Sequence, residues 1–96
     1  MVRIPQIQSI ETAIRLYYER IELTNTDIRE LFGKISGATI SKLKETAREK
    51  MREENAPVWN ARWVRTDSAY RAWGLNIDDL EKRHAKLKKL GLIKEA

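Results

Sequence analysis

The residues best suited to chemistry lie between positions 34 and 52 of this 96-residue chain. Six lysines and arginines and two glutamates occur there, a local net charge of +4, among small hydroxyl side chains. Ammonium and guanidinium groups can donate to phosphate oxygens and to guanine, and a glutamate can accept from the amine of cytosine. This combination is typical of a surface that reads a nucleic acid.

These residues need helices to position them, and the pattern from 24 to 52 predicts two. Thr24 or Thr26 is expected to cap the first helix, because a hydroxyl accepts a hydrogen bond from a free amide of the opening turn. Gly33 stands where the chain must leave that helix, since glycine takes a left-handed backbone without steric cost. Three apolar residues fall at helical spacing on one predicted buried face: Ile28, Leu31 and Phe32.

A second, longer helix is predicted from Ser36, its expected cap, to about Asn55, because Pro57 disfavours helical geometry just before it. Its apolar stripe predicts which side is buried. That stripe consists of Ile40, Leu43, Ala47 and Met51.

The opposite side of this helix is expected to face outward, and its N-terminal half is where base contacts are made when such a helix enters a major groove. The predicted base-reading residues are Ala38, Thr39, Ser41, Lys42 and Glu45. The predicted phosphate-binding residues are Lys34, Lys44, Arg48 and Arg52.

The run DIRELFGKISGATISKLK, residues 27–44, resembles the helix-turn-helix of bacterial and phage DNA-binding proteins. The residues that match its pattern are Leu31, Gly33, Ile35, Ser36, Thr39, Ile40 and Ser41. Two positions depart from it: the turn carries one extra residue near Lys34, and Arg29 replaces the usual small alanine. The resemblance implies recognition of double-stranded DNA by a bacterial or phage transcriptional regulator, or by a small terminase subunit that selects DNA for packaging.

Two other hypotheses for the function remain open. The helices could form an ordinary hairpin with solvated charges, in which case the Leu/Trp surface of residues 58–92 would dock on a protein partner. The aromatic residues between basic ones also keep single-stranded binding as a minor alternative. If the protein recognises double-stranded DNA, a homodimer is favoured, because one small recognition helix contacts few base pairs and a dimer doubles the site.

Outside this motif, a helix is predicted from the Ser9 cap to about Glu22, with Ile10, Ala13, Ile14, Tyr17 and Ile21 as its stripe. The segment 58–65 could form a short strand, but helical or irregular structure is favoured, because no second strand is apparent to pair with it.

The C-terminal third predicts two further helices. Thr66 is expected to cap the first, which runs to Trp73 and ends at Gly74, and Asn76 to cap the second. The second helix carries an apolar stripe, and Gly91 ends it with Leu92 folding back. This hairpin is interpreted as a scaffold or dimerisation element. The stripe consists of Ile77, Leu80, His84, Leu87 and Leu90.

The expected fold class is therefore all-α. Residues 1–96 are predicted to form one small multi-helix domain, with a three-helix helix-turn-helix core at 9–55 and a C-terminal helical extension at 58–92.

Composition limits the other functions. A net charge of +5 and a pI near 9.7 favour a polyanionic partner. The absence of cysteine excludes disulfides and thiolate metal sites. No apolar run reaches the ~18 residues of a membrane span, and a cytoplasmic protein is expected. No catalytic group, metal site or cofactor motif is apparent; His84, the single histidine, is expected to pack against its stripe.

Overall fold

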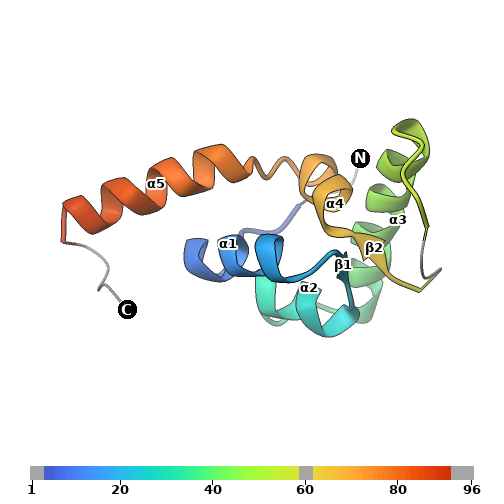
Figure 1. Cartoon of the computed structure of the whole chain (residues 1–96). Helices are drawn as coiled ribbons and strands as arrows, with labels where there is room; N and C mark the ends of the chain where they lie inside the picture. The colour runs from blue at the N-terminus through green and yellow to red at the C-terminus, as the bar shows by residue number, and fades with distance from the viewer. Residues whose placement is uncertain (1–3, 59–61, 92–96) are drawn as a thin grey trace.

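The computed structural model describes residues 4–58 and 62–91, and these are mostly helical (Figure 1). The expectation of a helical class is confirmed, although a small antiparallel sheet is also present. In chain order the elements are α1 (Ile10–Glu19), β1 (Glu22–Leu23), α2 (Asn25–Phe32), α3 (Gly37–Glu53), β2 (Val64–Arg65), α4 (Thr66–Ala72) and α5 (Ile77–Lys89).

Four of the helices begin at a polar side chain that accepts a hydrogen bond from a backbone amide of the first turn. Ser9 caps α1, Thr24 caps α2, Ser36 caps α3 and Asn76 caps α5, each accepting from the amide three residues later. These caps agree with the sequence prediction, because short hydroxyl and amide side chains satisfy amides that have no partner within the helix.

The strand pair corrects the prediction for residues 58–65. Val64–Arg65 is a strand, with Leu23 opposite Val64 and Glu22 opposite Arg65. The sequence does not predict its partner strand, because the predicted first helix extends to Glu22. In the structure α1 ends three residues earlier, at Glu19. Residues 59–61, Trp59 among them, lie outside the described residues.

This earlier end of α1 also changes which of its residues form the core. Ile21 was expected on the buried stripe but is 57% exposed, since it lies past the helix. Leu16, which is not one of the predicted stripe residues, is fully buried with Ala13. The helix therefore turns a slightly different face inward than the predicted spacing indicated.

In α4 the predicted cap is wrong, but Ala69, Tyr70 and Trp73 bring the helix into the core. Arg65 occupies the cap position, and Thr66 is the first helical residue. The Thr66 hydroxyl is buried and has no hydrogen-bond partner within residues 4–58 and 62–91. The Tyr70 hydroxyl donates to the Ala13 carbonyl at 2.5 Å, and burial raises the pKa of that phenol. This bond joins α4 to α1.

The C-terminal third does not fold back on itself as the predicted hairpin would. Gly74 leaves α4 with a φ of +74°, and α5 then packs mainly on α1 rather than on α4. Figure 1 shows α5 extending beyond the other helices. Of its predicted stripe Leu80 is buried, whereas Leu90 is 62% exposed. Gly91 has a left-handed backbone, as expected of a helix end, and Leu92 lies outside the described residues.

Candidate nucleic-acid interface

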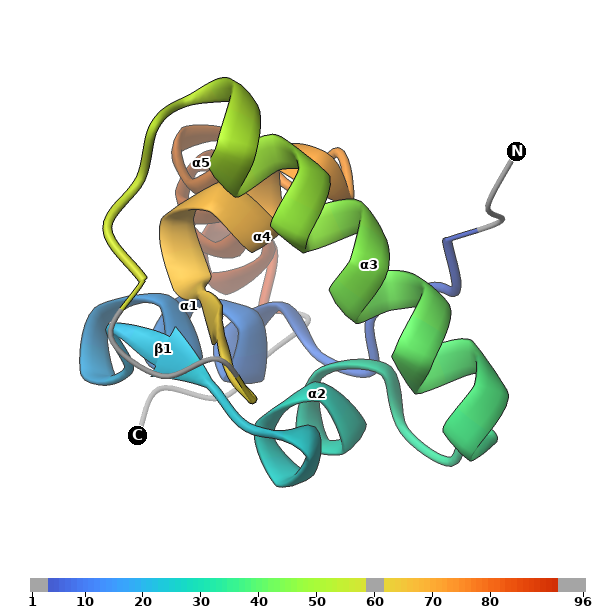
Figure 2. The same ribbon diagram turned by 90° about the vertical axis from the view of Figure 1, so that its right-hand side faces the viewer.

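Helix α3 lies across the outside of the molecule, with α2 beneath its N-terminal end and α4 behind it (Figure 2). All four residues of its predicted apolar stripe are buried, and they anchor the helix in the core. Phe32 of α2 and Trp73 after α4 meet edge to face behind it, with ring centroids 5.3 Å apart. The Trp73 indole N–H also donates to the Leu43 carbonyl at 3.0 Å. The orientation of α3 is thus determined from both neighbouring helices.

The predicted base-reading residues lie where the sequence placed them relative to this stripe. Ala38, Ser41, Lys42 and Glu45 are exposed. Thr39 is half-buried, and its amide donates to the Ser36 hydroxyl at 3.1 Å. The two hydroxyls also lie within hydrogen-bond distance, 3.0 Å. Thr39 therefore takes part in capping α3, and the other four residues form its accessible N-terminal face.

The predicted phosphate-binding residues fall into two groups. Lys34 in the turn and Arg52 near the end of α3 are exposed. Lys44 is half-buried, and its ammonium donates to the Asn25 side-chain oxygen at 3.1 Å. Burial lowers the pKa of Lys44, and the positive charge of Arg48 adds to that shift. Lys44 therefore also connects α3 to the first turn of α2.

Arg48 and Arg52 border a small hollow of about 220 Å³ at the C-terminal half of α3. Its other lining residues are mainly apolar and include Met51, Val58 and Trp63. Val58 is 63% exposed and Trp63 is 40% exposed. The hollow therefore combines two guanidinium groups with accessible apolar surface.

The outer face of α3 is mixed in charge. Lys42 and Arg52 share it with Glu45 and Glu49, all four exposed. A carboxylate repels phosphate but can accept from a cytosine amine in a major groove. Net attraction to a polyanion must therefore come from Lys34 and from the flanking cations rather than from this face alone.

The turn before α3 depends on a contact that the sequence did not reveal. Gly33 has a φ of +84°, and a Cβ atom there would lie 2.4 Å from the Gln8 side-chain nitrogen. That nitrogen donates to the Phe32 carbonyl at 3.3 Å, and the Gln8 amide donates to the Leu31 carbonyl at 2.8 Å. The N-terminal segment thus satisfies the last carbonyls of α2, where the helix itself provides no donors.

At the start of α2, Thr24 and Asp27 form a reciprocal capping box. The Asp27 amide donates to the Thr24 hydroxyl at 3.2 Å, and the Thr24 amide donates to the Asp27 carboxylate at 3.0 Å. The threonine-x-x-aspartate spacing is a signal from which the box could have been predicted, since capping boxes place an acceptor three residues after the cap.

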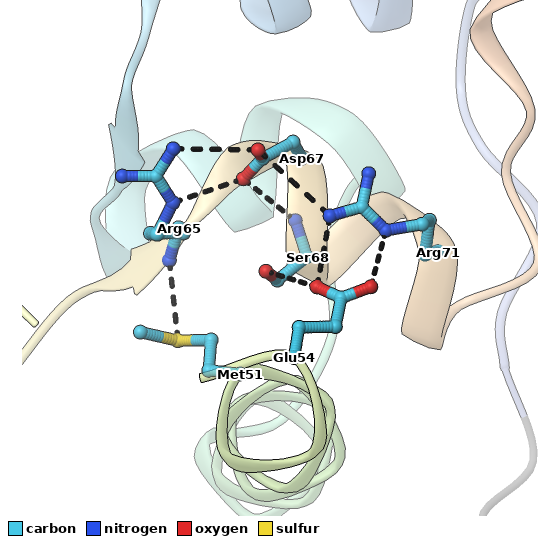
Figure 3. A network of polar contacts seen from close by, with 6 residues as sticks. All are labelled: Met51, Glu54, Arg65, Asp67, Ser68 and Arg71. Atoms are coloured by element: carbon cyan, nitrogen blue, oxygen red, sulfur yellow. Dashed lines mark hydrogen bonds and ion pairs between the residues drawn. The ribbon is translucent and has the colours of Figure 1, made fainter. Parts of the chain in front are cut away.

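A cluster of polar side chains joins the end of α3 to α4 (Figure 3). The Glu54 carboxylate accepts from the Arg71 guanidinium at 2.5 and 2.8 Å and from the Ser68 hydroxyl at 2.7 Å. Asp67 lies 3.8 Å from Arg71 and accepts from Arg65 at 3.1 and 3.3 Å. The hydrogen bonds from Arg71 and Ser68 lower the pKa of Glu54 to about 2. Ser68 and Arg71 of α4 thus hold the C-terminal end of α3, and Asp67 connects Arg71 to Arg65 of β2.

Within residues 4–58 and 62–91 there is no group of three or more histidine, aspartate or glutamate side chains arranged to hold a metal ion. His84 is half-buried on α5, with its Nε2 3.6 Å from the Glu11 carboxylate. None of the described helices has the length and apolar character that a membrane span requires.

No protein-family model matches the chain, and no curated protein or solved structure is significantly similar to it. The functional argument therefore depends on the geometry of α2, α3 and their surroundings.

Proposed function

We propose that this protein binds double-stranded DNA sequence-selectively, with α2 and α3 acting as a helix-turn-helix. The observation that carries the proposal is the exposed N-terminal face of α3, formed by Ala38, Ser41, Lys42 and Glu45, on a helix whose opposite side is buried. In helix-turn-helix proteins this half of the second helix reads base edges in the major groove.

Each side chain on this face suits a different base edge. Lys42 can donate to guanine, Glu45 can accept from cytosine and the Ala38 methyl can contact the thymine methyl. Ser41 can donate or accept. Lys34 precedes this face in the turn, and Arg48 and Arg52 follow it along α3. They would contact phosphates, which sets the position of the helix without reading sequence.

Rigid support of α3 is also consistent with base reading, because hydrogen bonds to base edges demand a defined helix orientation. The Lys44–Asn25 bond joins α3 to α2, the Trp73–Leu43 bond fixes its middle, and the Glu54 cluster fixes its end. The biological role we propose is transcriptional regulation; selection of DNA for packaging is the other role, and a large ring instead of a dimer would favour it.

The proposal is tested by selection from a randomised duplex pool at several salt concentrations. We expect enrichment of a defined site, with an affinity that falls steeply as salt increases. The double variant Lys42→Glu/Arg52→Glu should lose both the site enrichment and the steep salt dependence. The control Lys88→Glu/Lys89→Glu changes the net charge equally on exposed positions at the end of α5 and should keep site enrichment. Binding that is equally weak for all duplexes, or equally sensitive to both double variants, would overturn sequence-selective recognition by α3.

A protein-docking function has one specific observation in its favour, the exposed apolar surface of Val58 and Trp63. Lys42→Glu alone changes an exposed residue that does not line the hollow and would leave such docking intact, whereas Val58→Asp would weaken it. Retention of a protein partner by the first variant and loss by the second would therefore support docking rather than DNA binding.

A further inference from the structure

Helix α5 extends past the helix that supports it. His84 lies near Glu11, and the Glu81 carboxylate accepts from the Tyr18 hydroxyl. Since the later α5 residue meets the earlier α1 residue, the two helices are antiparallel. The last turns of α5, which carry Leu87 and Leu90, therefore continue beyond the start of α1 (Figure 1). Leu90 is 62% exposed there.

A groove of about 480 Å³ lies at the other end of α5. Its apolar lining includes Ile7, Trp73 and Leu75, and α5 contributes Asp79 and Arg83 to its wall. At about 100° per residue, Leu87 and Leu90 follow Arg83 at four and seven residues and so lie on the same side of the helix. One face of α5 thus has an apolar groove at its start and an apolar projection at its end.

We propose that a second copy of this chain covers this face, with the two α5 helices antiparallel about a two-fold axis near Lys82 and Arg83. A two-fold interface uses the same patch on both copies, so the patch must be self-complementary. The antiparallel arrangement meets that requirement, because Leu87 and Leu90 of each copy reach the groove beside Leu75 and Trp73 of the other.

The charges of Asp79 and Lys86 favour the same arrangement and offset the like charges of Lys82 and Arg83 that approach each other at the axis. Asp79 and Lys86 are seven residues apart, two helical turns, and therefore lie on the same edge of this face. In an antiparallel pair with two-fold symmetry, like edges face each other, so each Asp79 meets Lys86 of the other copy. A parallel pair with two-fold symmetry would instead bring opposite edges of the two helices together, so Asp79 and Lys86 would not meet. The attraction between Asp79 and Lys86 thus favours the antiparallel dimer.

This dimer goes beyond the proposed DNA binding and does not depend on it, because the interface uses α5 and the groove rather than α3. Its consequence for DNA would be a two-fold symmetric site, with one half-site for each α3. A protein that dimerises and does not bind DNA would contradict only the proposed function, and a monomer that binds DNA would contradict only this inference.

The first test is sedimentation equilibrium of the full chain without DNA. We expect a reversible dimer at micromolar concentration for the wild type. Leu90→Asp should raise the dimer dissociation constant at least ~100-fold, because a carboxylate would replace a buried apolar contact. Its circular dichroism spectrum should be unchanged, and so should its melting temperature below the dimer dissociation constant. Val58→Asp, an equally exposed apolar position away from α5, should still dimerise. A wild-type monomer at all concentrations, or equal effects of the two variants, would overturn the inference.

The second test exchanges the charges of the proposed pair. Asp79→Lys alone and Lys86→Glu alone should each weaken self-association about tenfold, because each creates two repulsive contacts in its homodimer. An equimolar mixture of the two variants should associate like the wild type, since both cross-pairs become attractive. The matched controls Asp78→Lys and Lys88→Glu change charge at exposed positions about 100° from Asp79 and about 200° from Lys86 around the helix, and should have little effect. Failure of the mixture to recover association would overturn the antiparallel arrangement.

Discussion

Helices α3 and α5 have similar sequences in outline but different surroundings. Each begins at a side-chain cap and carries an apolar stripe at helical spacing. All four stripe residues of α3 are buried, whereas Leu90 at the end of the α5 stripe is 62% exposed. The difference is that α3 packs on α2, α4 and β2, while α5 packs mainly on α1. Apolar periodicity thus predicts a helix and its inward face, but burial depends on what other elements the chain supplies.

The two helices also differ in how polar groups hold them. The Glu54 cluster and the Trp73 indole connect α3 to α4 through hydrogen bonds of 2.5 to 3.0 Å. The contacts from α5 to α1 are exposed or half-buried, as with His84 and Glu11 at 3.6 Å. We therefore expect substitutions on the inner side of α3 to affect folding, and substitutions at the end of α5 to affect association.

The largest expected difference is between Leu43→Asp and Leu90→Asp. Leu43 is fully buried, so an unpaired carboxylate there should cost more than about 4 kcal/mol and unfold most of the protein. Leu90→Asp should change the free energy of unfolding of the monomer by less than about 0.5 kcal/mol. Urea unfolding followed by circular dichroism, below the dimer dissociation constant, measures both. Similar losses in the two variants would remove the proposed distinction between α3 and α5.

The glycines that precede the two helices should also differ. Gly33 and Gly74 both have positive φ, +84° and +74°, which disfavours any side chain. At Gly33 an added methyl would also meet the Gln8 side chain, whereas the space at Gly74 is open. We expect Gly33→Ala to destabilise by about 3 kcal/mol and Gly74→Ala by about 1 kcal/mol.

Thermal unfolding of both glycine variants, and of Gly33→Ala combined with Gln8→Ala, separates the two causes. The shorter side chain at position 8 should recover part of the loss at Gly33. No recovery would mean that backbone strain alone accounts for the effect.

The Glu54 cluster predicts a pH dependence at the end of α3. Because folding lowers the pKa of Glu54 to about 2 from an ordinary value of 4.5, its contribution is complete above the unfolded pKa. That contribution is lost as pH falls from about 5 to about 2, where the carboxylate takes up its proton. Glu54→Gln should remove about 1 kcal/mol at neutral pH, since solvent still reaches the pair.

The control for this pH dependence is Glu53→Gln, whose carboxylate is 68% exposed and lies 3.6 Å from Lys50. Urea unfolding at several pH values should show a smaller acid loss for Glu54→Gln than for the wild type and an unchanged loss for the control. If the free energy of unfolding fell with pH in the same way for all three proteins, the acid loss would not come from Glu54.

Much of the α3 side of this comparison could be predicted from the sequence. Local signals determine α2 and α3. Thr24 and Ser36 each cap a helix by accepting from the amide three residues later, and the apolar residues from Ile40 to Met51 recur at helical spacing. The contacts that could not be predicted join distant positions. Gln8 reaches Gly33, Val64 pairs with Leu23, and Arg71 meets Glu54, and no local pattern relates these pairs. The prediction that α4 and α5 form a hairpin is wrong for the same reason, because the apolar stripe of α5 does not determine which helix packs on it.

The smallest expected effect on stability, and the one that bears most directly on α3, is that of Lys42→Ala. Lys42 is exposed and follows the buried Ile40 by two residues, so its side chain points away from the core. The free energy of unfolding should change by less than about 0.5 kcal/mol. If Lys42 donates to guanine, discrimination at one base-pair position should fall by about 1–3 kcal/mol while affinity for other duplexes changes little. Arg52→Ala, the matched control, should weaken all duplexes about equally and reduce the salt dependence, as loss of a phosphate contact does. Competition binding with single-base-pair variants of a selected site, at several salt concentrations, measures discrimination and overall affinity for the two variants. A uniform loss in the Lys42 variant would assign that residue to phosphate and leave base reading to Ser41 and Glu45.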